Sequence, residues 1–475
     1  MVFSSLLFTF IFLPLVVCLY FIAKDRYRNY ILLVASLLFY AYGEPKFVFV
    51  MLASIALNYG FAFFIGREND RDHHRTAKSL LVFDIILNLS LLFVFKYLNY
   101  SVVILNHVFG KELQDPGISL PIGISFFTFQ ALSYCIDVYR GTVKVQKNPL
   151  FVALYISFFP QLIAGPIVRY STIEDQITQR FTSIYDFGEG VRRFFLGFSK
   201  KVILANNLSV VAAQAFDTNA AQADLVLLWL GSICFSLQIF YDFSGYSDMA
   251  IGLGRIFGFH FDENFNYPYI ARSITEFWRR WHISLSGWFR DYVYIPLGGS
   301  RVSVPRNILN LFVVWLLTGI WHGANVTFLV WGLMYFVLLT VEKFIIKPDK
   351  RKFVLFSVLW RIVTLFFVNL GWVIFNSPDI RGALDYIQGM LGLFNNRFMI
   401  DSELKRTFRE YGFFVIAGLI FATPVVKLLG EKLEKMSHGR LTVSVITPLV
   451  YCFLFLWAVS FLILGAHNPF IYFNF

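Results

Sequence analysis

The feature that most constrains this chain is a succession of long apolar runs separated by short turns that carry lysine and arginine. Residues 47–65, 79–95 and 353–375 are examples, and runs of about 20 apolar residues are long enough to cross a bilayer as helices. With 57% hydrophobic and 15% charged residues, a soluble globular domain is excluded. The sequence therefore predicts an all-α multi-pass membrane protein.

The net charge of +11 has a topological explanation. In a soluble domain it would suggest nucleic-acid binding, but here the basic residues gather in turns such as 67–78 and 343–352. Such turns stay in the cytoplasm, so we expect an N-terminus outside, membrane lipids around the chain and no nucleic-acid partner. We expect one domain over residues 1–475, with roughly ten to twelve crossings.

Some apolar runs contain polar or helix-breaking residues. Residues 151–167 include Pro160 and the Gly165-Pro166 pair, which predicts a broken or re-entrant segment that is covered by protein or lines a cavity. Asp84 and Asn88 lie one helical turn apart. We expect a structural hydrogen-bonded pair there, with a functional role as the alternative.

Polar residues concentrate between residues 241 and 325, in the strings YDFSGYSD, EFWRRWHISLSGWFRDYVYIPLGG and LLTGIWHGAN. A helix over residues 276–293 would gather polar side chains within a sector of about 80°: Arg279, His282, Ser286 and Arg290. The opposite side would be apolar: Phe277, Trp281, Leu285 and Trp288. We expect the polar set to line a cavity. An interfacial helix with snorkelling arginines is the alternative, but it leaves the histidine unexplained.

His322 interrupts the apolar run 308–339, and ionisable groups at such depth usually mark function. On a helix it would share a face with Trp315, Thr318 and Asn325. Gly319 and Gly323 form a small-xxx-small pair that lets another backbone approach. The alternative is a neutral imidazole that only hydrogen-bonds a neighbouring helix.

Two carboxylates precede these histidines. Asp242 and Asp248 could orient a histidine, or could pair with Arg279 or Arg255. The four cysteines are far apart in apolar surroundings, and their spacing indicates no metal site.

Several strings together resemble the membrane-bound O-acyltransferase superfamily, and within it the bacterial alginate O-acetyltransferase branch: LPIGISFFTFQALSYCIDVYRG, FFPQLIAGPIVRY, YDFSGYSDMAIGLGRIFGFHFDENFNYPY, RRWHISLSGWFRDYVYIPLGG, GIWHGAN and NPFIYFNF. The resemblance implies acyl transfer in a tunnel within a helical fold that includes re-entrant helices. It makes His322 the central catalytic residue and places His282 at the same site. We expect substrate-positioning roles for further residues of the stretch: Asp242, Arg279, Trp281, Ser286, Arg290, Trp321 and Asn325.

Acyl transfer to a hydroxyl needs a base, and a buried neutral imidazole can serve. The chain has no G-x-S-x-G nucleophile elbow, which favours direct transfer, although an acyl-histidine intermediate stays open. We expect no tightly bound cofactor, and a donor at the cytoplasmic face that is acetyl-CoA or another acyl thioester.

The resemblance also implies partners and a location. We expect an exported serine-hydrolase-like acetyltransferase, machinery for polysaccharide synthesis and export, and the bacterial inner membrane as the site. The alternatives are D-alanyl transfer to teichoic acid and O-acetylation of peptidoglycan. A transporter is an alternative of another class, but no repeated half-chain of the kind common in transporters is evident.

Overall fold

The computed structural model describes residues 1–348, 353–436 and 439–465, without the side chains of residues 439–443. Throughout these residues the regular structure is helical and contains no strand, which confirms the predicted all-α fold. Part of the predicted basic loop, residues 349–352, and the terminal NPFIYFNF string lie outside the described residues.

Eight helices of the described residues are long and apolar enough to span a membrane. A ninth span is the pair Ser402–Phe421 and Val425–Glu434, bent by 66°, if it crosses as one unit. Other apolar helices are shorter, such as Phe8–Ile22. The chain is thus a multi-pass membrane protein, and the larger number of crossings expected from the sequence stays a prediction.

The chain divides into two compact units, each described here by itself. The first comprises Met1–Phe194 and Met249–Asp262, and the second comprises Phe195–Asp248 and Glu263–Phe475. The division concerns packing within each unit, so the single domain predicted from the sequence also stays a prediction.

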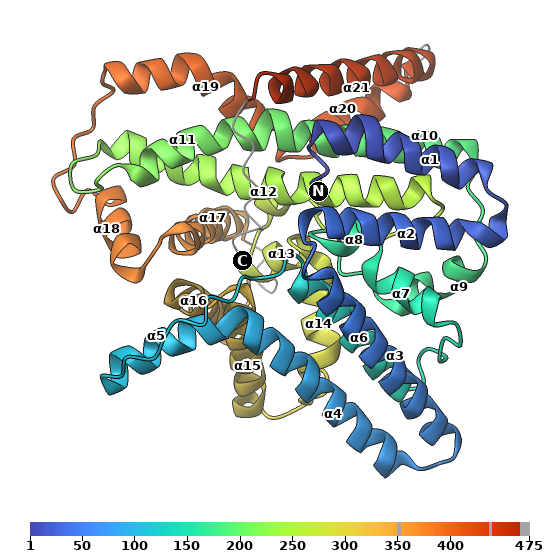
Figure 1. Ribbon diagram of the computed structural model, residues 1–475. Coiled ribbons are helices and arrows are strands. Elements are labelled where there is room, and N and C mark those ends of the chain that lie inside the picture. Colours follow the sequence, from blue (N-terminus) through green and yellow to red (C-terminus); the bar gives the residue numbers. More distant parts are fainter. Residues whose placement is uncertain (349–352, 437–438, 466–475) are drawn as a thin grey trace. The chain divides into compact units, whose positions relative to one another are not determined.

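The first unit begins with a π-helical turn and a series of antiparallel helices (Figure 1). Its elements are η1 (Phe8–Phe12), α1 (Leu13–Ile22), α2 (Asp25–Gly43), α3 (Val48–Asp70), α4 (His74–Leu92), η2 (Phe93–Tyr97), α5 (Leu98–Phe109), α6 (Ile124–Tyr139), α7 (Pro149–Ser157), α8 (Phe159–Leu162), α9 (Tyr170–Thr178) and most of α10 (Ile184–Ser199). The end of α12 (Leu225–Ile256) also belongs to it.

Polar side chains join α3 and α4 in the interior of the first unit. Asn88 donates to the carboxylate of Asp84 (3.0 Å), and Asn58 on α3 exchanges hydrogen bonds with Asn88 (3.1 Å each way). All three side chains are buried. The predicted Asp84–Asn88 pair is confirmed, and it extends to a third residue that fastens the hairpin.

The predicted break in the apolar run 151–167 is also confirmed. α7 ends at Ser157, α8 lasts for a single turn, and the following residues through Arg169 are not helical although most are buried. Gly123 makes room for this irregular backbone, because an added Cβ would lie 2.8 Å from the carbonyl oxygen of Leu162. Such backbone is tolerated at depth only where protein covers it.

The second unit contains the polar stretch of the sequence. It starts with η3 (Lys200–Ala205), α11 (Asn206–Asp217) and the first part of α12, and continues with η4 (Pro268–Ile270), α13 (Ile274–Arg280), α14 (Ile283–Phe289), η5 (Arg290–Tyr294), α15 (Val304–His322), α16 (Val326–Val341), η6 (Glu342–Ile346), α17 (Val354–Asn376), α18 (Ile380–Met390), α19 (Ser402–Phe421), α20 (Val425–Glu434) and α21 (Gly439–Ile463). α15 and α16 form a tight hairpin (Figure 1).

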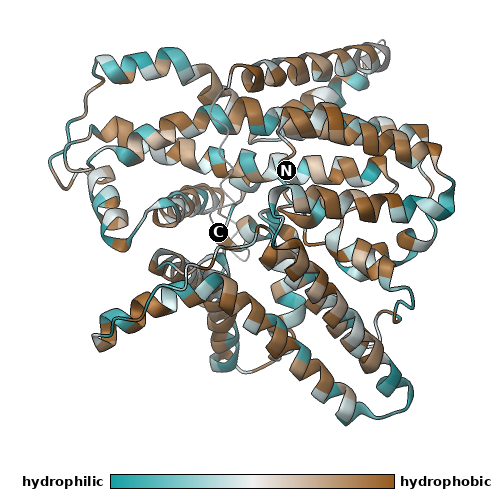
Figure 2. Ribbon diagram, in the orientation of Figure 1, coloured by the Kyte–Doolittle hydropathy of each residue, from teal (hydrophilic) through white to brown (hydrophobic). Residues whose placement is uncertain are grey.

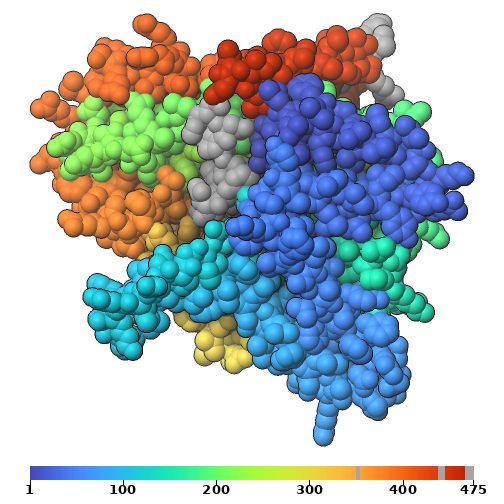
Figure 3. Space-filling view, viewed as in Figure 1, coloured from blue at the N-terminus to red at the C-terminus, as the bar shows by residue number. Residues whose placement is uncertain are grey.

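Many large apolar side chains point away from the protein interior, as a membrane protein requires. On α4, Phe83, Ile86 and Leu89 are exposed, and the helix is mainly brown on the hydropathy scale (Figure 2). Figure 3 shows α4 and α5 at the surface of the first unit. These faces have the character of lipid-contacting surface.

Candidate active site

His322 is the last residue of α15, and the helix ends where Gly323 follows it. Three residues later Asn325 begins α16, because its side chain accepts a hydrogen bond from the backbone N–H of Thr327 (3.1 Å). Such an N-cap starts a new helix. The apolar run 308–339 is therefore a hairpin of two helices and not one continuous helix.

The predicted neighbours of His322 divide between the helix and the turn. Trp315 and Thr318 are buried on α15 as His322 is, in agreement with the shared face expected from the sequence. Asn325 lies beyond the helix end, and its side chain donates to the carbonyl of Pro378 (2.6 Å). It therefore holds the turn against the segment before α18.

Two glycines let α15 and α16 pack at very short distance. A Cβ added to Gly319 would lie 2.6 Å from the carbonyl oxygen of Phe328, and one added to Gly332 would lie 2.5 Å from that of Trp315. Backbone cannot move aside as a side chain can, so both positions require glycine. The predicted close approach at Gly319 is confirmed, and the approaching backbone belongs to the next helix.

This packing encloses the imidazole of His322 in aromatic rings. Its ring centroid lies 5.0 Å from that of Trp331 on α16 and 5.1 Å from that of Phe375 on α17, both in nearly perpendicular contact. The residue is 6% exposed. Perpendicular contacts of this kind fix the orientation of a ring.

His282 lies at a break between α13 and α14, where the sequence predicted one helix over residues 276–293. The backbone of His282 is left-handed (φ 43°, ψ 56°). The N–H of Ile283, which would continue the helix by bonding the carbonyl of Arg279, bonds the carbonyl of Asn264 instead (2.9 Å). A non-glycine residue in this conformation costs on the order of 1–3 kcal/mol and often belongs to a functional site.

Asn264 fixes the tautomer of the His282 ring. Its Oδ1 accepts from the backbone N–H of Ser284 (3.2 Å), and since a backbone N–H only donates, this atom is the amide oxygen. The same Oδ1 lies 3.1 Å from Nδ1 of His282. The proton is therefore on Nδ1 and the lone pair on Nε2. Burial lowers the pKa of His282 to about 3, so the ring is neutral near pH 7.

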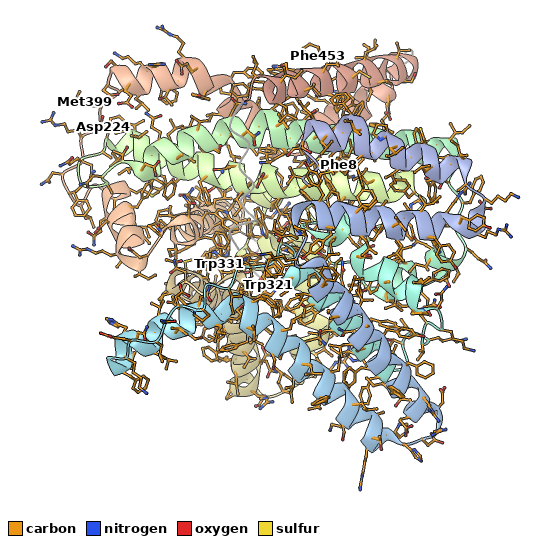
Figure 4. All side chains as sticks on the ribbon, viewed as in Figure 1. Phe8, Asp224, Trp321, Trp331, Met399 and Phe453 are labelled. Atoms are coloured by element: carbon orange, nitrogen blue, oxygen red, sulfur yellow. The ribbon has the colours of Figure 1, made fainter. Side chains whose placement is uncertain are left out.

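Trp321 contacts both histidines. Its ring centroid lies 4.9 Å from that of His322 and 6.3 Å from that of His282. The other side of the His282 ring meets Phe243 of α12 edge-on at 4.5 Å. The structure thus brings the two histidines into one buried cluster around Trp321, which Figure 4 labels together with Trp331.

The other residues of the predicted polar stripe do not join this cluster. Arg279 is exposed, and Arg290 is exposed and paired with Asp291 (2.6 Å). The hydroxyl of Ser286 donates to the carbonyl of Trp278 (3.3 Å). The shared sector was wrong because the turn at His282 rotates α14 out of the register of α13.

The predicted apolar side, in contrast, is buried as expected: Phe277, Trp281, Leu285 and Trp288. Trp281 packs against Trp372 of α17, with ring centroids 4.7 Å apart, and against Phe265 at 5.2 Å. These contacts anchor the break between α13 and α14 in the aromatic core.

Asp242 and Asp248 pair with lysines, and not with Arg279 or Arg255 as the sequence suggested. Lys201 lies 2.6 Å from Asp242, with both side chains only 2% exposed, and also donates to Asn206 (3.0 Å). Lys200 lies 2.6 Å from Asp248. Lys201 is thus buried within a membrane-spanning helix.

A further buried carboxylate supports α13. Glu342 accepts hydrogen bonds from the backbone N–H groups of Ile274 (2.8 Å) and Thr275 (3.0 Å). These groups have no partner within the helix, and the N-terminal end of a helix favours negative charge. Glu342 therefore fixes the start of the short helix that leads to His282.

Sequence reasoning missed four residues of this region: Lys201, Phe243, Asn264 and Trp331. Phe243 and Asn264 lie inside a string quoted for the family resemblance, so that string could have directed attention to them. Lys201 and Trp331 carry no local signal, because only tertiary packing brings them to the site. Among the described residues, no group of three or more His, Cys, Asp and Glu side chains could hold a metal ion.

Comparison with known proteins identifies the family. Residues 140–377 match the model of the membrane-bound O-acyltransferase family, MBOAT. This chain belongs to that family. The matched region contains both histidines, Trp321 and the α15–α16 hairpin. It is accordingly an O-acyltransferase of the multi-pass membrane type.

Curated relatives extend the match over the whole chain. The probable alginate O-acetylase AlgI of Pseudomonas aeruginosa is 42% identical over 89% of this chain and 81% of its own length. The protein of the same name from Pseudomonas putida is 38% identical over 100% of both chains. The peptidoglycan O-acetyltransferase of Helicobacter pylori is 33% identical over 100% of this chain and 98% of its own. The resemblance predicted from the motifs is confirmed.

Proposed function

We propose that this O-acyltransferase moves an acetyl group from a thioester donor at the cytoplasmic face to a hydroxyl, for the O-acetylation of an exported polysaccharide of the alginate kind. The observation that carries the proposal is the position of His322. It is an imidazole at the end of a membrane-spanning helix, enclosed by aromatic rings, in a chain of this family.

In the proposed reaction His322 is the general base. An imidazole nitrogen takes the proton of the acceptor hydroxyl as its oxygen attacks the carbonyl carbon of the thioester. The electron pair of the carbonyl moves to its oxygen and then returns as the C–S bond breaks. The thiolate leaves and takes the proton from the imidazolium. Proton transfer by a positioned side chain of this kind contributes about 10²–10⁴-fold to the rate.

His282 has a supporting role in this proposal. Its proton is fixed on Nδ1 by Asn264, so Nε2 can accept a hydrogen bond from substrate. The shared contact with Trp321 keeps it near His322. We infer that His282 positions the substrate, with Trp281, Trp321, Asp242 and Asn325 holding the surrounding elements. Arg279, Ser286 and Arg290 lie outside the histidine cluster, and we infer that they act where substrate enters.

The acceptor is proposed from the relatives. Two relatives that match along most or all of the chain are named for alginate and one for peptidoglycan, and all three names refer to O-acetylation. They support acetyl over D-alanyl as the transferred group. Peptidoglycan is the alternative acceptor. Acetyl transfer from a soluble thioester donor to each purified polymer, measured in parallel, would distinguish it from alginate.

The proposed location is the bacterial inner membrane, with the N-terminus outside and the loop 67–78 in the cytoplasm. Loops rich in arginine and lysine favour the cytoplasmic side. Donor thioesters are cytoplasmic and the polymer is exported, so the acetyl group has to pass through the membrane. We infer a tunnel past His322 for this transfer, and an exported serine-hydrolase-like acetyltransferase as the partner that completes delivery.

The test is the ester content of exported polysaccharide in cells that carry His322→Ala or His282→Ala at matched membrane levels. We expect His322→Ala to remove transfer by about 10² or more and His282→Ala to impair it less. Cys135→Ser, a change at a buried residue of the first unit, is the control. Near-normal ester with His322→Ala would overturn the proposal, and transport activity that survives in this variant would favour a transporter.

A further inference from the structure

The aromatic core beside His322 contains buried hydrogen-bond donors that have no acceptor among the described residues. Among them are the indole Nε1 atoms of Trp278 and Trp331 and the hydroxyl of Tyr335. Trp331 and Tyr335 are fully buried. Buried polar groups in folded proteins nearly always have a partner, and each exception needs an explanation. Three in one place point to a group that is supplied from outside the chain.

The three side chains form one cluster. The ring centroid of Trp278 on α13 lies 5.4 Å from that of Trp331 and 4.8 Å from that of Tyr335, and the latter two lie 5.1 Å apart on α16. Trp331 is in turn the ring that contacts His322 at 5.0 Å. One of the three donors therefore belongs to a ring that contacts the proposed base, and the other two pack against that ring.

Similar side chains elsewhere in the second unit do find acceptors in the protein. Trp229 donates to the carbonyl of Met390 (2.8 Å), and Tyr386 donates to that of Leu228 (2.8 Å). Such pairing is not universal, because Nε1 of Trp360 also has no acceptor among the described residues, but at Trp278, Trp331 and Tyr335 three such groups lie together. At the cluster of Trp278, Trp331 and Tyr335, two of the three groups can only donate, so the missing group is an acceptor.

We propose that Trp278, Trp331 and Tyr335 bind the carbonyl oxygen of the acyl group and stabilise the negative charge that develops on it during transfer. The inference rests on the proposed function, since it assumes attack at a thioester carbonyl beside His322. When the acceptor oxygen adds to the carbonyl carbon, the π electron pair moves onto this oxygen, and the N–H and O–H groups donate to it. The charge returns to form the C=O bond as the C–S bond breaks.

Preorganised donors act where charge develops, in surroundings that exclude water. Because the carbonyl oxygen that they would bind belongs to the acyl donor, the ligand class of this site is an acyl thioester.

The test uses two variants that remove a donor and two matched controls. Tyr335→Phe removes only the hydroxyl, and Tyr386→Phe makes the same change where the hydroxyl is bonded to protein. Trp331→Phe removes one donor and some ring volume, and Trp315→Phe removes the same volume from the same core, where Trp315 contacts Trp278 at 4.9 Å. Each is purified at full length, and acetyl transfer from acetyl-CoA is measured.

We expect Tyr335→Phe and Trp331→Phe to lower kcat by about 10²–10³, the usual loss of one such donor, with the donor KM changed only a few-fold. The controls should keep kcat within a few-fold. In the absence of the acyl donor, Tyr335→Phe should melt at the wild-type temperature or above, because the hydroxyl that it removes has no hydrogen bond within the protein. An unchanged kcat in both variants, whatever happens to KM, overturns the inference, and so does a lowered melting temperature of Tyr335→Phe.

His322→Ala is measured in the same series so that two failures are distinguishable. If His322→Ala transfers acetyl at a normal rate, the proposed function fails. If His322→Ala is inactive and the donor variants are normal, only the role of the aromatic donors fails.

Discussion

Replacing Lys201 by methionine should destabilise the second unit strongly, because it removes the ammonium 2.6 Å from the Asp242 carboxylate in an interior where both side chains are 2% exposed. Breaking one partner of a buried ion pair costs about 3–5 kcal/mol, since the remaining charge stays away from water. Asp242 is followed by Phe243, which contacts His282, so acyl transfer should fall as well.

The double variant Lys201→Met, Asp242→Leu separates the cost of a lone charge from the value of the pair. Replacing both partners by apolar residues is often neutral, or stabilising by about 1–4 kcal/mol. We therefore expect the double variant to regain wild-type stability and most of the acyl transfer. The reason is that Asp242 acts by holding α12, and hence Phe243, in place.

The assay is the apparent melting temperature of the purified protein in detergent, followed by size-exclusion chromatography of heated samples, with acetyl transfer measured in parallel. Lys200→Met is the matched control, because Lys200 also pairs with an aspartate, Asp248, but its side chain is 24% exposed. It should lower the melting temperature less. The reasoning is refuted if Lys201→Met is as stable as the wild type, or if the double variant is no more stable than Lys201→Met.

Three further results are expected. Burial lowers the pKa of His282 to about 3, below the unfolded value near 6.5, so its contribution to stability is present above pH 6.5 and is lost as the pH falls, by up to about 1.4 kcal/mol per pH unit. The melting temperature of His282→Gln should therefore depend less on pH between 6.5 and 5 than that of the wild type. An unchanged pH dependence contradicts this. Gly332→Ala should cost about 1–3 kcal/mol through a backbone clash, whereas Gly60→Ala, which meets nothing within 4 Å, should be neutral or stabilising by thermal melting. Single cysteines placed in the loop 67–78 should react with a membrane-impermeant maleimide only after the membrane is permeabilised. Labelling of these cysteines in intact cells would contradict the proposed topology.

Local patterns predicted the parts of the fold that depend on local chemistry. Asp84 and Asn88 are one turn apart on a helix, so their hydrogen bond follows from spacing. Pro160 lacks the N–H that would extend α7 and is tolerated in the first turn of α8, so the break in residues 151–167 follows from backbone geometry. The family motifs identified the two histidines, and packing brings both into contact with Trp321.

The parts that could not be predicted depend on tertiary contacts. The periodicity of residues 276–293 is helical, but the carbonyl of Asn264 takes the N–H of Ile283 and ends α13. The run 308–339 has no proline or charge at its centre, and a turn of only three residues at Gly323–Asn325 divides it. The lysine partners of Asp242 and Asp248 lie 41 and 48 residues earlier, and no spacing rule connects such distant positions.

The most direct test of the central claim is transfer of labelled acetyl by purified protein in proteoliposomes. Labelled acetyl-CoA is supplied on the side that carries the loop 67–78, and the acceptor polymer or a soluble hydroxyl mimic on the other. His322→Gln keeps a polar side chain of similar size but removes the base. The account predicts labelled ester with the wild type and a loss of about 10² or more with His322→Gln at equal reconstitution. Equal labelling by the two proteins would contradict it.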